Sequence, residues 1–419
     1  MGRRNLLLLT IDAWRADFVD GYFNVALTPN LSAHRGRTVR FDGLHSNGPW
    51  TTPGLLPMFT GEGPARHGVH WAWSQPRPDS RGLASVLAAA GFDVPNLCYL
   101  NQVGNYFHLG YDPATSPAYP KAPDDPVLFD ALTAHAGKRA PFFGWYHYKF
   151  VHLPYWPAVA HREALGIRDA ALAPRLLASV CKEFVVERAR FPLDPVADAE
   201  PVRRLYAAGV RQMDVWLGRV FAHIQALDLW DDTTIVLTSD HGEELLERGH
   251  VGHASTAEHA LLNEELLRIP LLVLDARMAA PGTAGMSYGA DLRLEGRDLF
   301  PTLLGLAGVE APAGHGGVDV SDLVLAPERF IAPPGFARRP FLLHSARMGY
   351  RTPKSHAAHA LYGLTVGREK LIVERYETER ASLYDLVADP GETTPALDLD
   401  QVARRVADLT AMWELAAGD

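Results

Sequence analysis

Residues 5–12 read NLLLLTID, and residues 234–243 read TIVLTSDHGE. Each stretch is a short apolar run that ends at an aspartate, Asp12 in the first and Asp240 in the second. Runs that are apolar at successive positions are typical of strands buried on both faces, as in a parallel sheet covered by helices. The two stretches therefore predict a sheet in which a carboxylate directly follows each of two strands.

The same kind of apolar run recurs at residues 93–99, 142–148 and 269–274. Helical patterns lie at residues 81–90, 126–136, 202–227 and 298–308. Asp125 is placed as an N-cap with Pro126 at the first helical position, and Gly308 ends the last of these helices. Strands and helices that alternate in this way indicate the α/β class, here a mostly parallel central sheet flanked by helices.

Residues 311–340 are rich in proline, glycine and alanine and predict a boundary between two units. We expect a larger unit over residues 1–325 and a smaller C-terminal α+β unit over residues 326–419. Strands are expected at 341–344, 362–366 and 370–374, followed by a closing helix at 400–416. The proline-rich stretches 112–125 and 192–201 are predicted to be surface loops.

The charge of the chain argues against nucleic acid or an anionic membrane as a partner. The chain has 49 acidic and 40 basic residues, which gives a net charge of -9. A protein of this charge that acts on anions must gather positive charge locally, from a metal, histidines or arginines. The apolar run at residues 5–11 is short for a signal peptide, and no segment reaches the roughly 20 apolar residues that span a bilayer. With only Cys98 and Cys181, we expect a cytoplasmic protein with reduced thiols.

Polar side chains directly follow three of the predicted strands. Asp12 follows residues 5–11, Asp240 and His241 follow residues 234–239, and His152 follows residues 142–148. Ligands of open α/β sheets bind at the carboxyl ends of the strands. Two carboxylates and an imidazole are a suitable set for one divalent cation. A strand-end carboxylate can also cap a helix, so each residue taken alone leaves both interpretations open.

Thr51 lies in the segment GPWTTPGLLPMFTG at residues 48–61. A hydroxyl two residues before a proline can cap a helix, because proline is tolerated in the first helical turn. The free N–H groups of a helix N-terminus also bind anions, and metal coordination activates a hydroxyl nucleophile. Thr51 is therefore either an N-cap or a nucleophile, and the sequence allows both roles together.

Several short segments follow one another in a recognisable order. They are residues 5–17, TPNL at 28–31, TG at 60–61, RHG at 66–68, residues 206–218, SDHGE at 239–243, and residues 264–270, 298–302, 383–386 and 389–392. Together they span nearly the whole chain and resemble the sulfatases and phosphonate monoester hydrolases of the alkaline phosphatase superfamily. The resemblance implies an alkaline phosphatase-like sheet, with the sulfatase-like catalytic domain at residues 1–325.

Position by position, the resemblance assigns metal ligation to Asp12, Thr51, Asp240 and His241. It also places Thr51 where the family has its nucleophile. His152 matches a histidine that contacts the substrate or the leaving group. His253 lies where relatives have a histidine or lysine that contacts the anion, and the nearby His250 is a further candidate for substrate binding.

The chain also departs from the family pattern. Sulfatases that use formylglycine have Cys or Ser, then Pro at the third place and Arg at the fifth, whereas residues 51–55 here read TTPGL. We therefore expect no formylglycine. Ala13 stands where many sulfatases have a second acidic ligand, and Arg248 replaces a histidine. Ligands of a second metal are not evident, so one metal is expected. Pro57 should bend the nucleophile helix.

We expect a hydrolase in which a metal-held Thr51 attacks a small anionic ester and His152 or His253 protonates the leaving oxygen. Phosphate diesters or phosphonate monoesters are preferred over sulfate esters, because threonine cannot expel sulfate by reverting to an aldehyde. The alternatives are a phosphoryl-group transferase and a non-catalytic binding protein that keeps the fold. The metal (Mn, Ca, Zn or Mg) and the oligomeric state, a homo-oligomer included, stay open.

The remaining candidates are given structural interpretations. These are surface or packed positions for His147, His344, His356 and His359, and core packing for Trp71 and Trp73, with pocket lining as the alternative for the two tryptophans.

Overall fold

The structure is a computed structural model. It describes residues 3–418 apart from residues 23, 70–73, 75, 78, 79, 101–109, 187–189, 191, 255, 257–260, 278–284, 347–359, 376 and 377. Trp71, Trp73, His356 and His359 lie outside the described residues.

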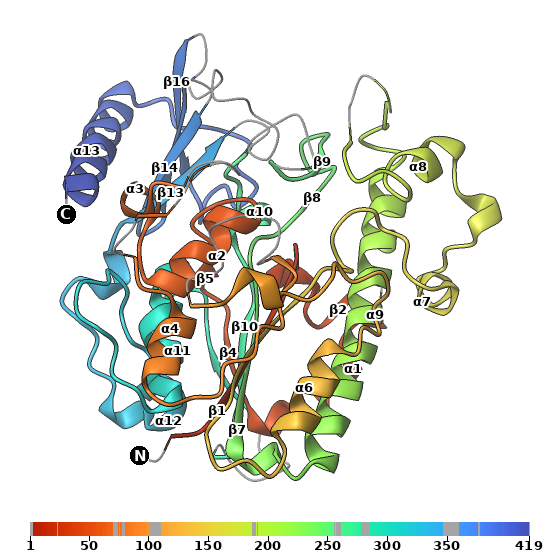
Figure 1. Ribbon diagram of the computed structural model, residues 1–419. Helices are drawn as coiled ribbons and strands as arrows, with labels where there is room; N and C mark the ends of the chain where they lie inside the picture. The colour runs from red at the N-terminus through yellow and green to blue at the C-terminus, as the bar shows by residue number, and fades with distance from the viewer. Residues whose placement is uncertain are drawn as a thin grey trace.

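A six-stranded sheet crosses the larger part of the molecule in the order β11-β4-β10-β7-β1-β6 (Figure 1). The strands are β1 (Asn5–Ile11), β4 (Thr38–Phe41), β6 (Phe143–Tyr148), β7 (Thr233–Ser239), β10 (Leu271–Leu274) and β11 (Met286–Tyr288). β1 pairs in parallel with both β6 and β7, and β11 pairs in parallel with β4. The prediction of a mostly parallel sheet is confirmed.

Two details of the predicted sheet are wrong. β10 is a strand, but it runs antiparallel to both β4 and β7. Residues 93–99 form no strand; Asp93 makes a single isolated bridge with Phe142. Pro95 explains this second error, because proline has no N–H to donate to a ladder.

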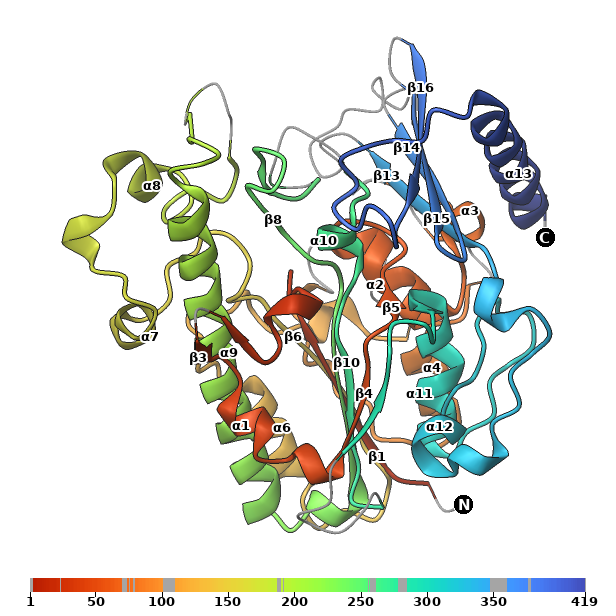
Figure 2. The same ribbon diagram turned by 180° about the vertical axis from the view of Figure 1, so that it is seen from behind.

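Helices cover both faces of the sheet, as predicted (Figures 1 and 2). On one face lie α1 (Pro29–Ser32), α6 (Val127–His135) and α9 (Ala199–Ala226), and on the other lie α2 (Thr51–Thr60), α4 (Leu83–Ala89), α11 (Leu299–Ala307) and α12 (Asp322–Leu325). β1 alternates between the two cores: Leu7 and Leu9 belong to the cluster that includes α9, whereas Leu6 and Leu8 belong to the cluster that includes α2 and α11. This alternation is the reason that β1 is apolar at successive positions.

A second, antiparallel sheet forms the C-terminal part, in the order β13-β14-β15-β16. Its strands are β13 (Phe341–Ala346), β14 (Ala360–Val366), β15 (Glu369–Arg375) and β16 (Glu379–Asp385), and α13 (Leu399–Gly418) lies along its outer side in both views (Figures 1 and 2). Three of these strands and the closing helix were predicted, and β16 was not. The boundary at residue 325 stays a prediction.

Short elements complete the fold. They are β2 (Gly21–Tyr22), β3 (Val25–Ala26), β5 (Leu44–His45), β8 (Glu244–Leu245), β9 (Val251–Gly252), β12 (Leu294–Glu295), α3 (Pro64–His67), α7 (Val159–Ala164), α8 (Pro174–Ala178) and α10 (Glu264–Leu267). Cys98 and Cys181 are both buried and free. Within the described ranges, no helix combines the length and apolar character needed to cross a membrane.

Candidate active site

Three parallel strands end at one edge of the central sheet. Ile11, the last residue of β1, is in register with Tyr148 of β6 and with Ser239 of β7. The next residue, Asp12, donates its backbone N–H to the carbonyl oxygen of Tyr148 at 2.8 Å. Asp12 and Asp240 therefore leave neighbouring strands side by side, as the strand-end argument predicts.

A compact group of carboxylates and imidazoles occupies this edge. The nearest ligand atoms of Asp12, His147 and Asp240 lie within 4.8 Å of one another, and all three residues are buried. Nε2 of His147 is 3.4 Å from Oδ2 of Asp12. Nε2 of His241 is 3.5 Å from Oδ1 of Asp12 and 3.3 Å from Oδ2 of Asp240. Three strand ends thus bring Asp12, His147 and Asp240 together, and His241 borders the two carboxylates.

Both imidazole rings are held by their other nitrogen. Nδ1 of His241 donates to the carbonyl oxygen of Gly242 at 2.7 Å, so a neutral ring keeps a lone pair on Nε2. Nδ1 of His147 contacts Oγ1 of Thr10 at 2.8 Å, which turns Nε2 of His147 toward the two carboxylates. Such contacts orient the histidine ligands of metal sites.

The inward-facing atoms of the group have no hydrogen-bond partner in the part of the chain that the structure describes. These atoms are Oδ1 of Asp12, Nε2 of His147, Oδ2 of Asp240 and Nε2 of His241. A buried polar atom without a partner costs about 1–3 kcal/mol. Two carboxylate oxygens and two imidazole nitrogens that converge in this way fit a divalent cation.

The charges of the group act on one another. Burial raises the pKa of Asp12, but His152, His147 and His241 lower it more, so its pKa lies well below the ordinary value. Burial likewise lowers the pKa of His147, but the contact with Asp12 at 3.4 Å and the charges of Asp12 and Asp240 raise it overall. Asp12 is thus held as a carboxylate.

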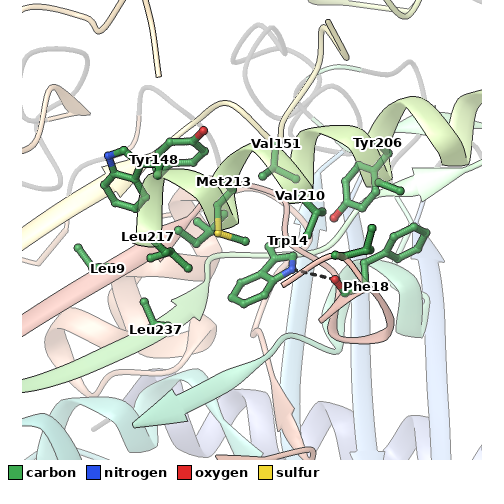
Figure 3. Close-up of a cluster of buried hydrophobic side chains, with 14 of the residues drawn as sticks. Leu9, Trp14, Phe18, Tyr148, Val151, Tyr206, Val210, Met213, Leu217 and Leu237 are labelled. Atoms are coloured by element: carbon green, nitrogen blue, oxygen red, sulfur yellow. Dashed lines mark hydrogen bonds between the residues drawn. The ribbon is translucent and has the colours of Figure 1, made fainter. Parts of the chain in front are cut away.

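The loop after β1 packs against α9 (Figure 3). Trp14 is fully buried and lies among Leu9, Leu237 and the α9 side chains Val210, Met213 and Leu217. Ala13 adopts a positive φ of 61°, which is rare for a residue with a Cβ. Its N–H donates to Oδ1 of Asp240 and its carbonyl oxygen accepts from the Tyr206 hydroxyl at 2.6 Å. The position where many sulfatases have a second acid is therefore a structural turn here.

Thr51 is the first residue of α2, and Trp50 occupies the N-cap position without a side-chain cap. The N-cap interpretation of Thr51 is therefore wrong, because the helix begins at Thr51 itself, one residue earlier than that role requires. Thr51 is partly exposed and lines a cavity of about 720 Å³ together with Asp12 and His152. α2 continues through Pro57 to Thr60. The predicted bend stays a prediction.

Gly54 sets how closely α2 approaches the strand ends. A Cβ at this position would lie 2.1 Å from the carbonyl oxygen of Asp240. No side chain can therefore be added without moving α2, and with it Thr51, away from Asp240.

We expect Gly54→Ala to destabilise the protein by about 1–3 kcal/mol, the usual cost of overpacking, and to lower activity because Thr51 is displaced. Urea unfolding and turnover on the same preparation would measure both effects. Gly209→Ala is the matched control, because its nearest neighbour would be 3.5 Å away. A Gly54→Ala protein that matches Gly209→Ala in both measurements would contradict the close approach.

Three histidines form a row behind the cavity. The ring centroids of His241 and His253 are 4.2 Å apart, and those of His253 and His152 are 4.8 Å apart. Nδ1 of His253 lies 2.7 Å from Oε1 of Glu243, whose pKa burial raises to about 7. Burial and the charges of His241 and His152 hold the pKa of His253 well below its ordinary value. Of the three, His152 lines the cavity.

Other predicted residues have different places. His250 lies in the turn between β8 and β9, where its carbonyl oxygen accepts from the Leu246 N–H, and it is not among the described cavity-lining residues. Arg248 pairs with Glu244 at 2.7 Å and also with Glu265, so it holds elements together. His344 is buried against Tyr362 and Trp413, as the packed interpretation predicted.

The sequence interpretation missed three residues of the site. His147 is packed as predicted, but its surroundings are the two carboxylates. His147 lies inside a strand whose residues are all buried. The sequence pattern of this strand therefore does not distinguish His147 from its apolar neighbours. Glu243 appeared only as part of the SDHGE motif. Lys149 lines the cavity with Nζ 3.3 Å from the Tyr119 ring centroid, and burial lowers its pKa to about 8.

A mostly parallel sheet with carboxylates, imidazoles and a helix-start hydroxyl at one edge defines an ester hydrolase of the α/β class. The sulfatase family model matches residues 4–309, and the chain belongs to that family. The family is part of the alkaline phosphatase superfamily, so the predicted resemblance, fold class and enzyme class are confirmed.

Individual relatives are distant and varied. The chain is 27% identical to the multifunctional alkaline phosphatase superfamily protein PehA of Trinickia caryophylli, over 76% of each chain. It is 24% identical to a choline-sulfatase of Rhizobium meliloti, over 99% of this chain and 86% of that protein. The crystal structure of a phosphonate monoester hydrolase from Agrobacterium radiobacter superposes with a TM-score of 0.73 at 20% identity, covering 99% of this chain and 96% of that one. This last likeness is one of fold.

Proposed function

We propose that this protein is a metal-dependent hydrolase that cleaves phosphate diesters, phosphonate monoesters or sulfate esters with Thr51 as the nucleophile. The observation that carries the proposal is that atoms of Asp12, Asp240, His147 and His241 without a hydrogen-bond partner among the described residues converge beside a cavity that Asp12 and Thr51 line. Relatives named as sulfatases and as a phosphonate monoester hydrolase support both ester classes. Family membership favours hydrolysis over the transferase and the binding protein.

Asp12, Asp240, His241 and His147 would hold the metal, and Thr51 lines the same cavity as Asp12. Two imidazoles with two carboxylates suit Zn or Mn better than Ca or Mg, which prefer oxygen ligands alone. When bound, the cation would stabilise the negative charge of the ester and favour ionisation of the Thr51 hydroxyl.

The chain's own residues account for the proton movements. Thr51 gives up its hydroxyl proton to solvent, its Oγ1 bonds to phosphorus or sulfur, and the bond to the leaving oxygen breaks. His152 lines the cavity and protonates that oxygen, so one proton is released and one is taken up. A water molecule then gives a proton to His152, attacks phosphorus or sulfur and breaks its bond to Oγ1 of Thr51, which takes up a proton from solvent. His253 lies behind His152 and is held largely neutral, which suits a hydrogen-bonding contact to the anion better than acid catalysis.

The covalent threonyl intermediate favours phosphorus over sulfur substrates, because release needs attack of water on the ester.

We expect the intact mass of the protein to match the encoded sequence, with no aldehyde at residue 51. Mass spectrometry of the intact chain and of the peptide that contains Thr51 checks this expectation. An aldehyde-bearing peptide would contradict it.

The test of the function is a panel of nitrophenyl phosphate diesters, phosphonate monoesters, phosphate monoesters and sulfates. Each is assayed with the metal-free protein and after addition of Zn, Mn, Mg or Ca. Metal-dependent turnover of a phosphorus ester is the expected result. Equal turnover with and without metal, or turnover of sulfate esters alone, would contradict the corresponding part of the proposal.

A further inference from the structure

Exposed aromatic side chains gather around the cavity. Among the described residues, the large aromatic side chains that are exposed are Tyr119, Trp156 and Phe184, at 50%, 43% and 46%. All three line the same cavity as Thr51 and Asp12. Trp156 and Phe184 flank the excursion that carries α7 and α8 beside α9 (Figures 1 and 2). Exposed apolar surface that is concentrated at one place marks a binding site.

Each ring is held in place by a partner. The guanidinium of Arg162 lies 3.8 Å from the Trp156 ring centroid, and Arg162 is itself buried and paired with Asp169 at 2.7 Å. Phe184 stacks on His152, with centroids 4.9 Å apart and planes at 24°. Binding to rings that are already fixed costs less conformational entropy.

The Tyr119 ring is also held in place by neighbouring side chains. Its ring packs edge-on against Tyr99 at 4.8 Å and carries the Lys149 ammonium over its face. The other lining residues include Leu100, Leu153, Pro154 and Pro157. At about 720 Å³, the cavity is several times the size of a phosphate or sulfate group and falls in the range of sites for drug-sized ligands.

We propose that the cavity binds the organic group of the ester and selects a large, flat aromatic group. The proposal rests on the proposed function and deepens it by naming the substrate class. The reacting anion lies at Thr51 and Asp12, and the aromatic group stacks on Trp156 and Phe184. Lys149 and Lys121 add positive charge to the lining, which favours an anionic ligand over a neutral one.

A sugar ester is the competing ligand, because sugar rings also stack on aromatic side chains. Sugars need many hydrogen bonds as well, whereas much of the described lining is apolar or aromatic. The Gln212 amide oxygen already accepts from the Ala158 N–H at 2.8 Å. The walls contributed by Leu100, Leu153 and the prolines offer no side-chain donor or acceptor.

The test is equilibrium binding to the metal-loaded protein, so that turnover is not needed. The probes are naphthylmethylphosphonate, methylphosphonate, glucose 6-phosphate and neutral 2-naphthol, each measured by calorimetry. We expect naphthylmethylphosphonate to bind about tenfold or more tightly than methylphosphonate, since stacked aromatic pairs contribute binding energy beyond that of area burial. Trp156→Ala and Phe184→Ala should each weaken the naphthyl ligand severalfold, and Trp156→Ala should weaken it far more than it weakens methylphosphonate.

Ile331→Ala is the matched control, because Ile331 is 88% exposed and lies outside the described lining. It should change neither affinity. Equal binding of the naphthyl and methyl ligands, or tighter binding of glucose 6-phosphate, would overturn the aromatic preference and leave the proposed function standing. Binding of 2-naphthol that is sensitive to Trp156→Ala, without binding of any phosphonate, would support the aromatic site and overturn the proposed function.

Discussion

Thr51→Ala should lower turnover by about three orders of magnitude or more, which corresponds to roughly 4 kcal/mol of barrier at 1.4 kcal/mol per tenfold. The attacking oxygen is lost with the Thr51 side chain. Stability should change little: Trp50 holds the N-cap position, so the mutation should cost less than the roughly 1 kcal/mol of a lost cap. Turnover and urea unfolding on one preparation measure both quantities.

Thr51→Ser is the control for this prediction. Serine keeps the attacking oxygen and should retain part of the turnover, whereas alanine should not. Thr52→Ala is a second control, because Thr52 lies next in α2 and lines the same cavity. A folded Thr51→Ala enzyme that turns over as fast as Thr52→Ala would remove Thr51 from the chemistry.

Asp12→Ala and Asp240→Ala should each abolish activity through loss of bound metal, because each removes one of two carboxylates from a buried group. His147→Ala should also lower metal occupancy if His147 is a metal ligand. If His147 only pairs with Asp12, the occupancy should stay the same. Atomic emission on protein dialysed against a fixed metal concentration gives the occupancy. Full occupancy in the aspartate variants would refute the metal assignment.

Asp275 provides the matched control for these carboxylates. It is buried and directly follows β10, as Asp240 follows β7, but it pairs with Arg277 and accepts from Thr234. Because β10 runs antiparallel to β7, Asp275 lies at the opposite edge of the sheet. Asp275→Ala should therefore cost stability and leave metal occupancy unchanged.

The comparison of Asp240 with Asp275 also explains what the sequence could predict. A carboxylate that follows an apolar strand lies at the edge of the sheet that holds the candidate site only if that strand is parallel to its neighbours. The apolar pattern of a strand does not reveal its direction. Asp12 and Asp240 were identified because their strands are parallel. The direction of β10 depends on pairing with β4, a short strand that the sequence pattern did not reveal.

The sequence analysis found candidate site residues where polar side chains directly follow a strand. It missed His147, which lies inside a strand. His147 is one residue from the end of β6, in a run with no polar alternation. Its role depends on Thr10 and Asp12, which are more than a hundred residues away in the chain. Such a contact depends on the register of β1 against β6, which single-sequence patterns do not fix.

Trp50 connects the nucleophile to the C-terminal part of the chain. Its side chain is buried in a cluster with Leu343, Leu361 and Ile372 from β13, β14 and β15. The residue immediately before Thr51 is thus anchored in a sheet that contributes no residue to the proposed metal site. A chimaera that exchanged residues 341–385 for those of a relative would replace the surface on which Trp50 rests. We therefore expect that replacing or removing the C-terminal sheet changes the position of Thr51 and so the activity.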